Sequence, residues 1–281
     1  ICLDNFSSGD EKNIDHLLAD PNFEFVRHDI TEPIDLERLP ELAKFKIEFQ
    51  GVQEIYHLAC PTSPKTFEQN KMAILLANSL GMKNALDLAA KYNAKFAHFS
   101  SSVVYGPRRD GNPKIKESDL GRVDMISARA SYDEGKRFSE TMVATFRDVH
   151  KIDAKIVRLF RTYGPRMKLD DGNMIPDFIS NALDNKDLTI FGDKNFSSSF
   201  CYVSDVVDAA VKIMETDLPG PFNVGSDVDV SIVDAANIII SFLGSKSKII
   251  YANNLLFMTS LCLPDIARAR EELGWMPVVT L

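Results

Sequence analysis

The chain has 281 residues, of which 45% are hydrophobic and 26% charged, an ordinary composition for a globular protein that can bury a sizeable core. Its net charge of -8 argues against nucleic acid as a partner, although a local cluster of Arg and Lys can still bind an anionic substrate. The longest uncharged apolar run, residues 253–264, is too short to span a bilayer, which argues against a membrane protein.

The first half of the chain alternates predicted strands with predicted helices. Strands are expected at 1–3, 23–26, 54–58, 96–99 and 154–160, and helices at 66–92 and 131–149. A polar surface loop is expected at 107–125. Strands and helices that alternate at this spacing predict a parallel sheet covered by helices on both faces.

The pattern loosens after residue 161. Helices are expected at 176–183, 206–214, 232–242 and 265–273, and short strands at 188–191, 201–203, 222–224 and 248–251. The second half therefore continues as alternating helices and strands, with shorter elements.

Neither the cysteines nor the histidines form a recognisable set. The four cysteines, Cys2, Cys60, Cys201 and Cys262, are far apart and predict free thiols in a reducing compartment, so we expect a cytoplasmic protein. The five histidines are not spaced as metal ligands, and no metal is expected.

Tyr132 and Lys136 are four residues apart and therefore share one face of a predicted helix. A lysine ammonium beside a phenol favours phenolate and lowers the pKa of the tyrosine. Such a tyrosine can take a proton from a sugar hydroxyl while a hydride leaves the same carbon. Ser101, at the end of a predicted strand, can hydrogen-bond that hydroxyl. The same spacing also fits an ordinary exposed pair on a helix.

Seven short segments, spread over nearly the whole chain, carry a resemblance to a known family. They are Asp4-Asn5-Phe6, His28-Asp29-Ile30, His57-Leu58-Ala59, Tyr132-Asp133-Glu134-Gly135-Lys136-Arg137, Tyr163-Gly164-Pro165-Arg166-Met167, Tyr202-Val203-Ser204-Asp205 and Pro264-Asp265-Ile266. The chain resembles the extended short-chain dehydrogenase/reductases that act on nucleotide sugars, and among them the UDP-glucuronate decarboxylases. The resemblance implies an α/β fold with a Rossmann-like, doubly wound parallel sheet in residues 1–162. It also implies a smaller α/β substrate lobe in residues 163–281, interleaved with the end of the first domain.

The implied cofactor is NAD. Asp4 at a strand end suits the two ribose hydroxyls of NAD, although an aspartate there also fits a turn cap. The resemblance assigns cofactor contacts to Asp4, Asn5, Asp29, Ile30, Leu58, Ala59, Tyr132 and Lys136. A dinucleotide-binding fold begins with a strand, a glycine-rich turn and a helix, and the acidic residue follows about 20 residues later. That glycine-rich turn is not found before Asp4, so we expect the first strand–turn–helix unit to be missing.

The implied reaction is oxidation at sugar C4 to a 4-keto intermediate, with Tyr132 as base. The chain lacks a charged residue of its relatives at four positions. Relatives carry glutamate where this chain has Val103, dehydratases carry aspartate at Ser102, and relatives carry arginines at Ser198 and Cys262. Ser102 and Val103 disfavour 4,6-dehydration, because eliminating water needs an acid and a base near C5 and C6.

Substrate contacts are expected from loops and from scattered charges. The resemblance assigns Pro61, Ser63, Asn78, Arg129, Arg166 and Phe178 to the nucleotide sugar. Arg161 stands where relatives have asparagine, and its planar guanidinium suits a diphosphate. An alternative stays open for three of these residues. Arg161 also fits a surface loop, Asn78 also fits the surface of a helix, and Phe178 also fits the core.

Three functions stay open from the sequence. The first is an NAD-dependent nucleotide-sugar enzyme, most like a UDP-glucuronate decarboxylase acting on a UDP-linked sugar. The second is a nucleotide-sugar 4-epimerase, for which Ser101, Tyr132, Lys136 and NAD suffice. The third is a non-catalytic nucleotide-binding relative. The resemblance also implies a homodimer formed through the helices at 66–92 and 131–149.

Overall fold

The structure is a computed structural model, and it describes residues 1–108, 114–253 and 260–281. Part of the loop expected at 107–125 and part of the apolar run at 253–264 lie outside these residues. Among the described residues, no helix is both long enough and apolar enough to cross a membrane.

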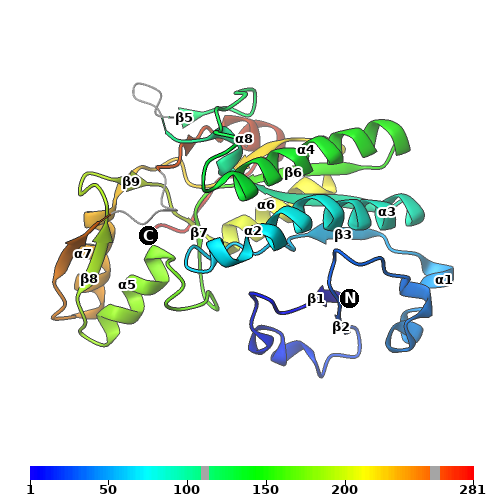
Figure 1. Cartoon of the computed structure of the whole chain (residues 1–281), viewed down its shortest axis with the longest axis horizontal. Coiled ribbons are helices and arrows are strands. Elements are labelled where there is room, and N and C mark those ends of the chain that lie inside the picture. Colours follow the sequence, from blue (N-terminus) through cyan, green and yellow to red (C-terminus); the bar gives the residue numbers. More distant parts are fainter. Residues whose placement is uncertain (109–113, 254–259) are drawn as a thin grey trace.

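A four-stranded parallel sheet forms the centre of the molecule (Figure 1). Its strands, in spatial order, are β11 (Phe222–Val224), β6 (Ala154–Leu159), β4 (Lys95–Ser101) and β3 (Glu54–His57). The strands β1 (Cys2–Asp4) and β2 (Phe25–Arg27) form a separate parallel pair. The expected strands are therefore present, and all their pairings are parallel.

Helices cover both faces of the sheet. One face packs against α3 (Met82–Tyr92) and α4 (Ala130–His150), which follow α2 (Phe67–Leu76), and the other face packs against α6 (Val203–Glu215). Alternate residues of β4 pack against the helices on opposite faces of the sheet, because successive side chains of a strand point to opposite faces. Phe96 packs toward α3 and α4, whereas Ala97 and Phe99 pack toward α6. This is the doubly wound α/β architecture expected from the sequence.

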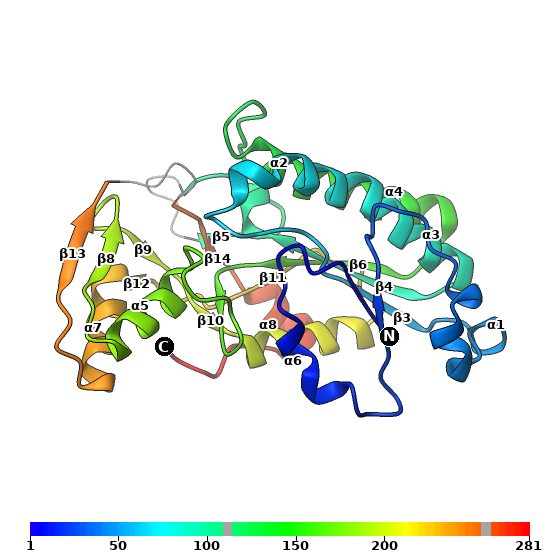
Figure 2. The same ribbon diagram turned by 60° about the horizontal axis from the view of Figure 1, so that its bottom comes forward.

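The segment expected as one helix at 66–92 is interrupted. A π-helical turn at Ala77–Gly81 separates α2 from α3. Such turns carry one extra residue and often mark functional positions. The helix α4 also runs beside α2, as both views of the chain show (Figures 1 and 2).

A second cluster of elements makes the smaller lobe. It contains α5 (Met174–Leu183), β8 (Leu188–Phe191), α7 (Ile232–Leu243) and β13 (Ile249–Ala252). These elements share a core that includes Phe178, Leu188 and Ile239. The boundary between residues 162 and 163 stays a prediction.

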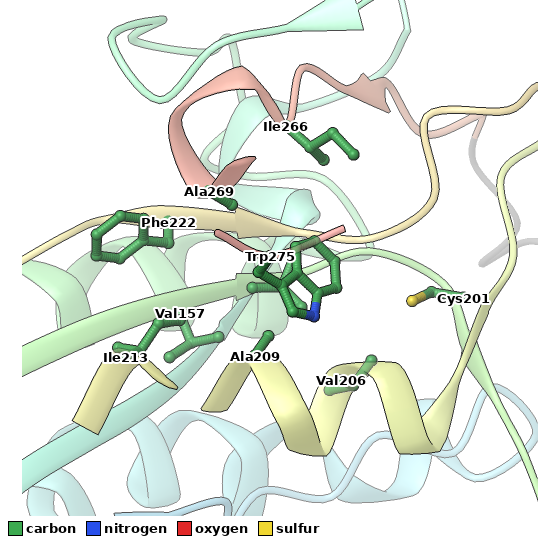
Figure 3. Close-up of a cluster of buried hydrophobic side chains, with 10 residues drawn as sticks. Val157, Cys201, Val206, Ala209, Ile213, Phe222, Ile266, Ala269 and Trp275 are labelled. Atoms are coloured by element: carbon green, nitrogen blue, oxygen red, sulfur yellow. The ribbon is translucent and has the colours of Figure 1, made fainter. Parts of the chain in front are cut away.

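Segments from the second half also complete the main sheet. The helix α8 (Ala267–Leu273) and Trp275 pack on β11 and α6, in a cluster where Trp275 is 1% exposed (Figure 3). The indole of Trp275 donates to the carbonyl oxygen of Asp205 at 2.9 Å. The end of the chain is thereby anchored to the same core as β6.

Short elements fill the connections. The strand pairs are β5 (Lys114–Ile115) with β14 (Leu263–Pro264), β7 (Thr162–Tyr163) with β10 (Cys201–Tyr202), and β9 (Ser197–Ser198) with β12 (Val230–Ser231). The connection at 32–50 holds α1 (Ile47–Gln50) and 3-10 turns at Leu36–Arg38 and Pro40–Phe45. Further 3-10 turns lie at Glu11–Asn13, Asp15–Leu17 and Ser102–Tyr105.

Candidate active site

The end of β4 and the first turns of α4 bring Ser101, Tyr132 and Lys136 together. The strand ends at Ser101, whose Oγ accepts the backbone N–H of Val103 at 3.4 Å and begins a 3-10 turn. Ser101 is also hydrogen-bonded to Tyr132. In the first turn of α4, Arg129 forms an ion pair with Asp133, with 3.1 Å between Nη2 and Oδ1. That pair supports the start of the helix.

Tyr132 is partly buried, with its ring edge-on to Phe67 at 6.2 Å between centroids. Burial raises the pKa of Tyr132, followed by a smaller effect of Cys60, whereas the hydrogen bond with Ser101 and the charge of Arg129 lower it. The expectation that the pKa of Tyr132 is lowered is therefore wrong for this structure, because desolvation outweighs the favourable contacts.

Lys136 is 5% exposed, and its Nζ donates to the carbonyl oxygen of Phe99 at 2.8 Å. Burial lowers the pKa of Lys136, and Cys60 and Glu140 act in the opposite direction. The ammonium therefore links α4 to β4. The alternative of an ordinary exposed helix pair does not fit, since Lys136 is buried and Tyr132 is partly buried.

The π-helical turn places Asn78 against the start of α4. Asn78 is 2% exposed, which excludes the helix-surface alternative, and its Nδ2 donates to the carbonyl oxygen of Ile74 at 2.9 Å and to Cys60 Sγ at 3.2 Å. A Cβ added at Gly135 would lie 3.2 Å from Asn78 Nδ2, so glycine permits this close approach. Asn78 and Cys60 thus line the same buried region as Lys136.

The expected cofactor residues lie at the ends of β1 and β2. Asp4 is exposed, and its Oδ1 accepts the backbone N–H of Phe6 at 2.7 Å, so it caps a turn as the alternative interpretation holds. Asn5 Nδ2 donates to Asp29 Oδ2 at 3.0 Å. Hydrogen bonds from Thr31 and then from Asn5 lower the pKa of Asp29. The site therefore presents two carboxylates on neighbouring strand ends.

Other expected contacts lie after β3 and beside α3. Leu58 is 59% exposed and Ala59 is also exposed. Ile30 is partly buried, and its carbonyl oxygen accepts Asn84 Nδ2 at 2.9 Å. Leu58 and Ala59 thus leave an uncovered apolar surface after β3, on the chain that leads to Cys60.

The loop after β3 is joined to the loop before α5. Pro61 and Ser63 are buried, and Ser63 Oγ donates to Asp171 Oδ1. The neighbouring Lys65 forms an ion pair with Asp170. The Ser63 hydroxyl is therefore committed to Asp171 in this structure.

The charge of Arg129 acts on Arg161 and also on Tyr132. The guanidinium of Arg161 lies over the ring of Phe196, 5.7 Å from its centroid. Burial, and then the charge of Arg129, lower the pKa of Arg161 to about 10. Two neighbouring guanidiniums favour an anion between or beside them.

Arg166 and Phe178 have other contacts. Arg166 Nη1 donates to the carbonyl oxygen of Asn13 at 3.3 Å and lies 3.4 Å from His16 Nε2. Phe178 is 3% exposed in the core of the smaller lobe. The structure therefore favours the core interpretation of Phe178 over stacking on a base.

The four positions that lack a charged residue of the relatives are all buried. Ser102, Val103, Ser198 and Cys262 are between 1% and 6% exposed. Cys262 packs with Val104, Tyr105 and Phe160. These side chains are part of the packed interior.

The sequence analysis missed Glu140 on α4 and Arg158 on β6, which form an ion pair with 2.7 Å between Oε2 and Nη2. The available signal was a carboxylate one helical turn beyond Lys136. A pocket of about 550 Å³ borders this pair on another flank of α4, and none of Ser101, Tyr132 and Lys136 lines it.

All four cysteines are free thiols, as expected. In residues 1–108, 114–253 and 260–281, no group of three or more His, Cys, Asp or Glu side chains is arranged to hold a metal ion.

Comparison with known proteins finds a matching family model and relatives of similar sequence. A family model described as the NAD dependent epimerase/dehydratase family matches residues 1–225. UDP-glucuronic acid decarboxylase 1 of Arabidopsis thaliana is 37% identical over 281 residues, which are all of this chain but only 61% of that protein's length.

Solved structures share the fold over nearly the whole chain. Pal from Bacillus thuringiensis has a TM-score of 0.83 and 26% identity over 99% of this chain and 86% of its own. UDP-glucuronic acid 4-epimerase from Bacillus cereus has a TM-score of 0.82 and 24% identity over 99% of this chain and 85% of its own.

Proposed function

The chain belongs to the NAD dependent epimerase/dehydratase family, as the seven segments indicated, and from this premise we propose that it modifies a nucleotide sugar by transient oxidation at C4. The proposed reaction is most like that of a UDP-glucuronate decarboxylase, the activity named for its 37%-identical plant relatives. The observation that carries the proposal is the junction of Ser101, Tyr132 and the buried Lys136, where β4 meets α4.

The strand ends fit a dinucleotide. Asp4 ends β1, and Asp29 follows the neighbouring strand β2 by two residues. Leu58 and Ala59 add exposed apolar surface after β3. A carboxylate accepts hydrogen bonds from both ribose hydroxyls. In this proposal Asp4, Asn5, Asp29 and Ile30 hold the adenosine end. NAD, when bound, would supply the acceptor for the hydride from sugar C4.

Tyr132 would take the proton of the C4 hydroxyl, and Ser101 would hydrogen-bond the same oxygen. The raised pKa of Tyr132 keeps it protonated in the structure as it stands. Its pKa must therefore fall when the site fills, and the ammonium of Lys136 on the same helix face favours the phenolate. Loss of carbon dioxide then follows from the 4-keto acid, because the keto group itself accepts the electron pair of the broken bond.

Arg161 and Arg129 are proposed as the anion contacts of the substrate. Arg161 would bind the diphosphate, and Arg129 would bind a sugar carboxylate. Pro61, Ser63 and Asn78 would line the sugar from the loop after β3 and the π-helical turn. The nucleotide is proposed to be UDP, as in the names of the plant relatives.

Epimerisation at C4 is the second candidate, and Val103 favours it. Val103 is apolar and 4% exposed where relatives carry a glutamate, so the strand end offers Ser101 and Tyr132 but no further acid. Together with Lys136 and NAD, those two residues would suffice for three steps: oxidation at C4, rotation of the keto sugar within the site, and reduction on its other face.

The product distinguishes these candidates. The purified protein would be incubated with NAD and UDP-glucuronate, and the products weighed by mass spectrometry. The proposal predicts loss of carbon dioxide in wild type and none in Tyr132→Phe. A new sugar of unchanged mass would support the epimerase instead. No product from UDP-glucuronate or from other UDP-sugars would contradict both.

A further inference from the structure

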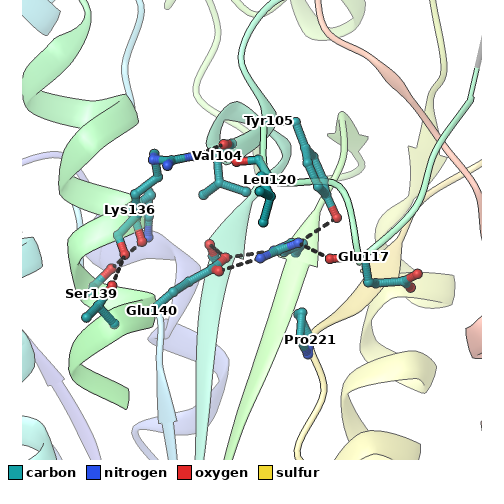
Figure 4. Close-up of polar contacts among 12 residues, drawn as sticks. Val104, Tyr105, Glu117, Leu120, Lys136, Ser139, Glu140 and Pro221 are labelled. Carbon is teal, nitrogen blue, oxygen red and sulfur yellow. Dashed lines mark hydrogen bonds and ion pairs between the residues drawn. The ribbon is translucent and has the colours of Figure 1, made fainter. Parts of the chain in front are cut away.

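Beyond Lys136 on α4, a second buried group faces the catalytic strand: the carboxylate of Glu140 (Figure 4). Glu140 Oε1 accepts Ser100 Oγ at 2.6 Å and Arg158 Nε at 2.9 Å, and Oε2 accepts Arg158 Nη2 at 2.7 Å. The side chains of Glu140 and Arg158 are both 12% exposed. Such a bidentate pair fixes geometry more strictly than a single hydrogen bond does.

Ser100 connects this carboxylate to the candidate active site. The residue before it, Phe99, offers the carbonyl oxygen that accepts Lys136 Nζ at 2.8 Å. The residue after it, Ser101, is hydrogen-bonded to Tyr132. Because planar peptide bonds leave little freedom between neighbours in a strand, a contact that holds Ser100 also restrains both.

Helix geometry explains why three side chains of α4 contact the end of β4. Tyr132, Lys136 and Glu140 are spaced by four residues, and each such step turns about 40° round an α-helix. The three side chains therefore form one gently sloping stripe along α4. They contact Ser101, Phe99 and Ser100 respectively, which are the last three residues of β4.

We propose that Glu140 is a positioning residue of the reaction, which holds the end of β4 through Ser100 so that Ser101 and the Phe99 carbonyl keep their places against Tyr132 and Lys136. It acts through these residues and not on the sugar. The inference rests on the proposed function, since it gives Glu140 a part in the proton transfer assigned to Tyr132.

The charge of Glu140 acts on Lys136 as well. Burial lowers the pKa of Lys136, while Cys60 and Glu140 raise it. Losing the carboxylate would therefore lower the pKa of Lys136 further, and the ammonium would be lost at a lower pH. Because the ammonium favours the phenolate of Tyr132, activity should then decline at a lower pH on the alkaline side.

Cys60 also raises the pKa of Lys136, and more strongly than Glu140 does, so loss of Glu140 removes the smaller of these two contributions. His57 on β3 and His98 on β4 are buried, and burial lowers the pKa of both, so they are neutral near pH 7. Cys60 interacts with Lys136 from the loop after β3, and Tyr132 lies on the same helix as Lys136. Around Glu140 itself, Arg158 comes from β6, and its Nη1 donates to the hydroxyl oxygen of Tyr105 at 2.8 Å and to the carbonyl oxygen of Glu117 at 3.1 Å.

The direct test is Glu140→Gln, which keeps the shape and removes the charge. We expect kcat to fall about tenfold, with KM and NAD affinity changed less than about twofold. The alkaline limb of the kcat profile should move to lower pH. Glu134→Gln is the matched control, since Glu134 lies on the same helix and forms an ion pair with Arg137, at 3.4 Å between Oε1 and Nε.

Because Glu140→Gln leaves Arg158 buried without its carboxylate, a second variant replaces both partners. The double variant Glu140→Leu with Arg158→Met removes the pair and leaves no uncompensated charge, an exchange that proteins often tolerate. The proposal predicts that this variant folds, that its kcat falls by the same factor, and that the alkaline limb of its kcat profile moves to lower pH as in Glu140→Gln. A folded double variant with wild-type kcat and pH profile would overturn it.

A titration separates the failure of this inference from failure of the proposed function. Labelling lysine with ¹³C and assigning Lys136 through Lys136→Arg allows its pKa to be followed by NMR without any turnover. The pKa of Lys136 should be lower in Glu140→Gln than in wild type. An unchanged value would overturn the role of Glu140, even if the wild-type protein converted no nucleotide sugar at all.

Discussion

The Nζ of Lys136 lies 2.8 Å from the carbonyl oxygen of Phe99, and this bond ties the helix that carries Tyr132 to the strand that carries Ser101. A lysine buried to 5% exposure keeps its charge only if its surroundings compensate for lost hydration. Here a backbone carbonyl and the nearby charge of Glu140 do so. The same ammonium thus serves both the packing of α4 on β4 and the chemistry proposed for Tyr132.

Arg161→Ala should weaken binding of a UDP-sugar about 10- to 100-fold, because charged hydrogen bonds to phosphate contribute about 1.5–3 kcal/mol. Arg161→Asn restores the residue that relatives carry and tests whether an amide can substitute. NAD affinity serves as the control and should stay within about twofold in both variants. Isothermal titration with UDP-glucuronate measures the change. Unaltered affinity in Arg161→Ala would remove the diphosphate role.

Phe178→Ala should destabilise the protein by about 3–5 kcal/mol, because Phe178 is 3% exposed in the core of the smaller lobe. Phe178→Leu keeps most of the apolar volume and should leave UDP-sugar affinity unchanged. Urea unfolding and binding titration measure the two effects. A large loss of affinity in a stable Phe178→Leu protein would instead favour stacking on the base.

His57 should make the protein less stable in acid. Burial, and then the charge of Lys136, lower the pKa of His57 from 6.5 to about 3. The unfolded chain therefore binds the proton more readily, so this stability is fully present above about pH 6.5 and is lost as pH falls toward about 3. His57→Leu should flatten the free energy of unfolding across that window, as measured by urea titration.

The control for this prediction is the same substitution at His150, which is exposed at the end of α4. His150→Leu should leave the slope of stability against pH as in wild type. If His57→Leu also keeps the wild-type slope, the buried imidazole does not account for the acid sensitivity of the fold.

The helices α2 and α4 should form a homodimer interface. Met72, Leu76, Leu80 and Phe138 are between 39% and 66% exposed on these adjacent helices and the turn after α2. Replacing Leu76 and Phe138 together by glutamate should yield monomers in sedimentation velocity, because each new charge would need desolvation at the interface. Replacing exposed Phe242 on α7 is the control. A wild-type protein that sediments as a monomer would refute the dimer.

Local patterns predicted the main elements of the fold well. The helix predicted at 131–149 is observed as α4, and Tyr132 and Lys136 do share a face that turns toward β4. The strands of the central sheet were also foreseen, to within one or two residues at most ends. These features depend on neighbours along the chain, which the sequence displays directly.

Contacts between distant segments were not predictable from one sequence. The hydroxyl of Ser63 is bonded to Asp171, 108 residues away, and nothing near Ser63 signals that partner. The π-helical turn depends on packing between Asn78 and Gly135, which single-helix periodicity does not contain. The pKa of Tyr132 depends on total burial, so the effect expected from lysine alone had the wrong sign.

The central claim is that Tyr132 drives oxidation at sugar C4, and rapid mixing tests it most directly. The purified protein, with NAD, would be mixed with UDP-glucuronate while NADH absorbance is recorded through a single turnover. The account predicts a transient rise in NADH in wild type. In Tyr132→Phe the rise should be slower by about 10²- to 10⁴-fold, although NAD and UDP-glucuronate still bind. A transient of equal rate in the variant, or product formed by wild type without any NADH, would contradict the account.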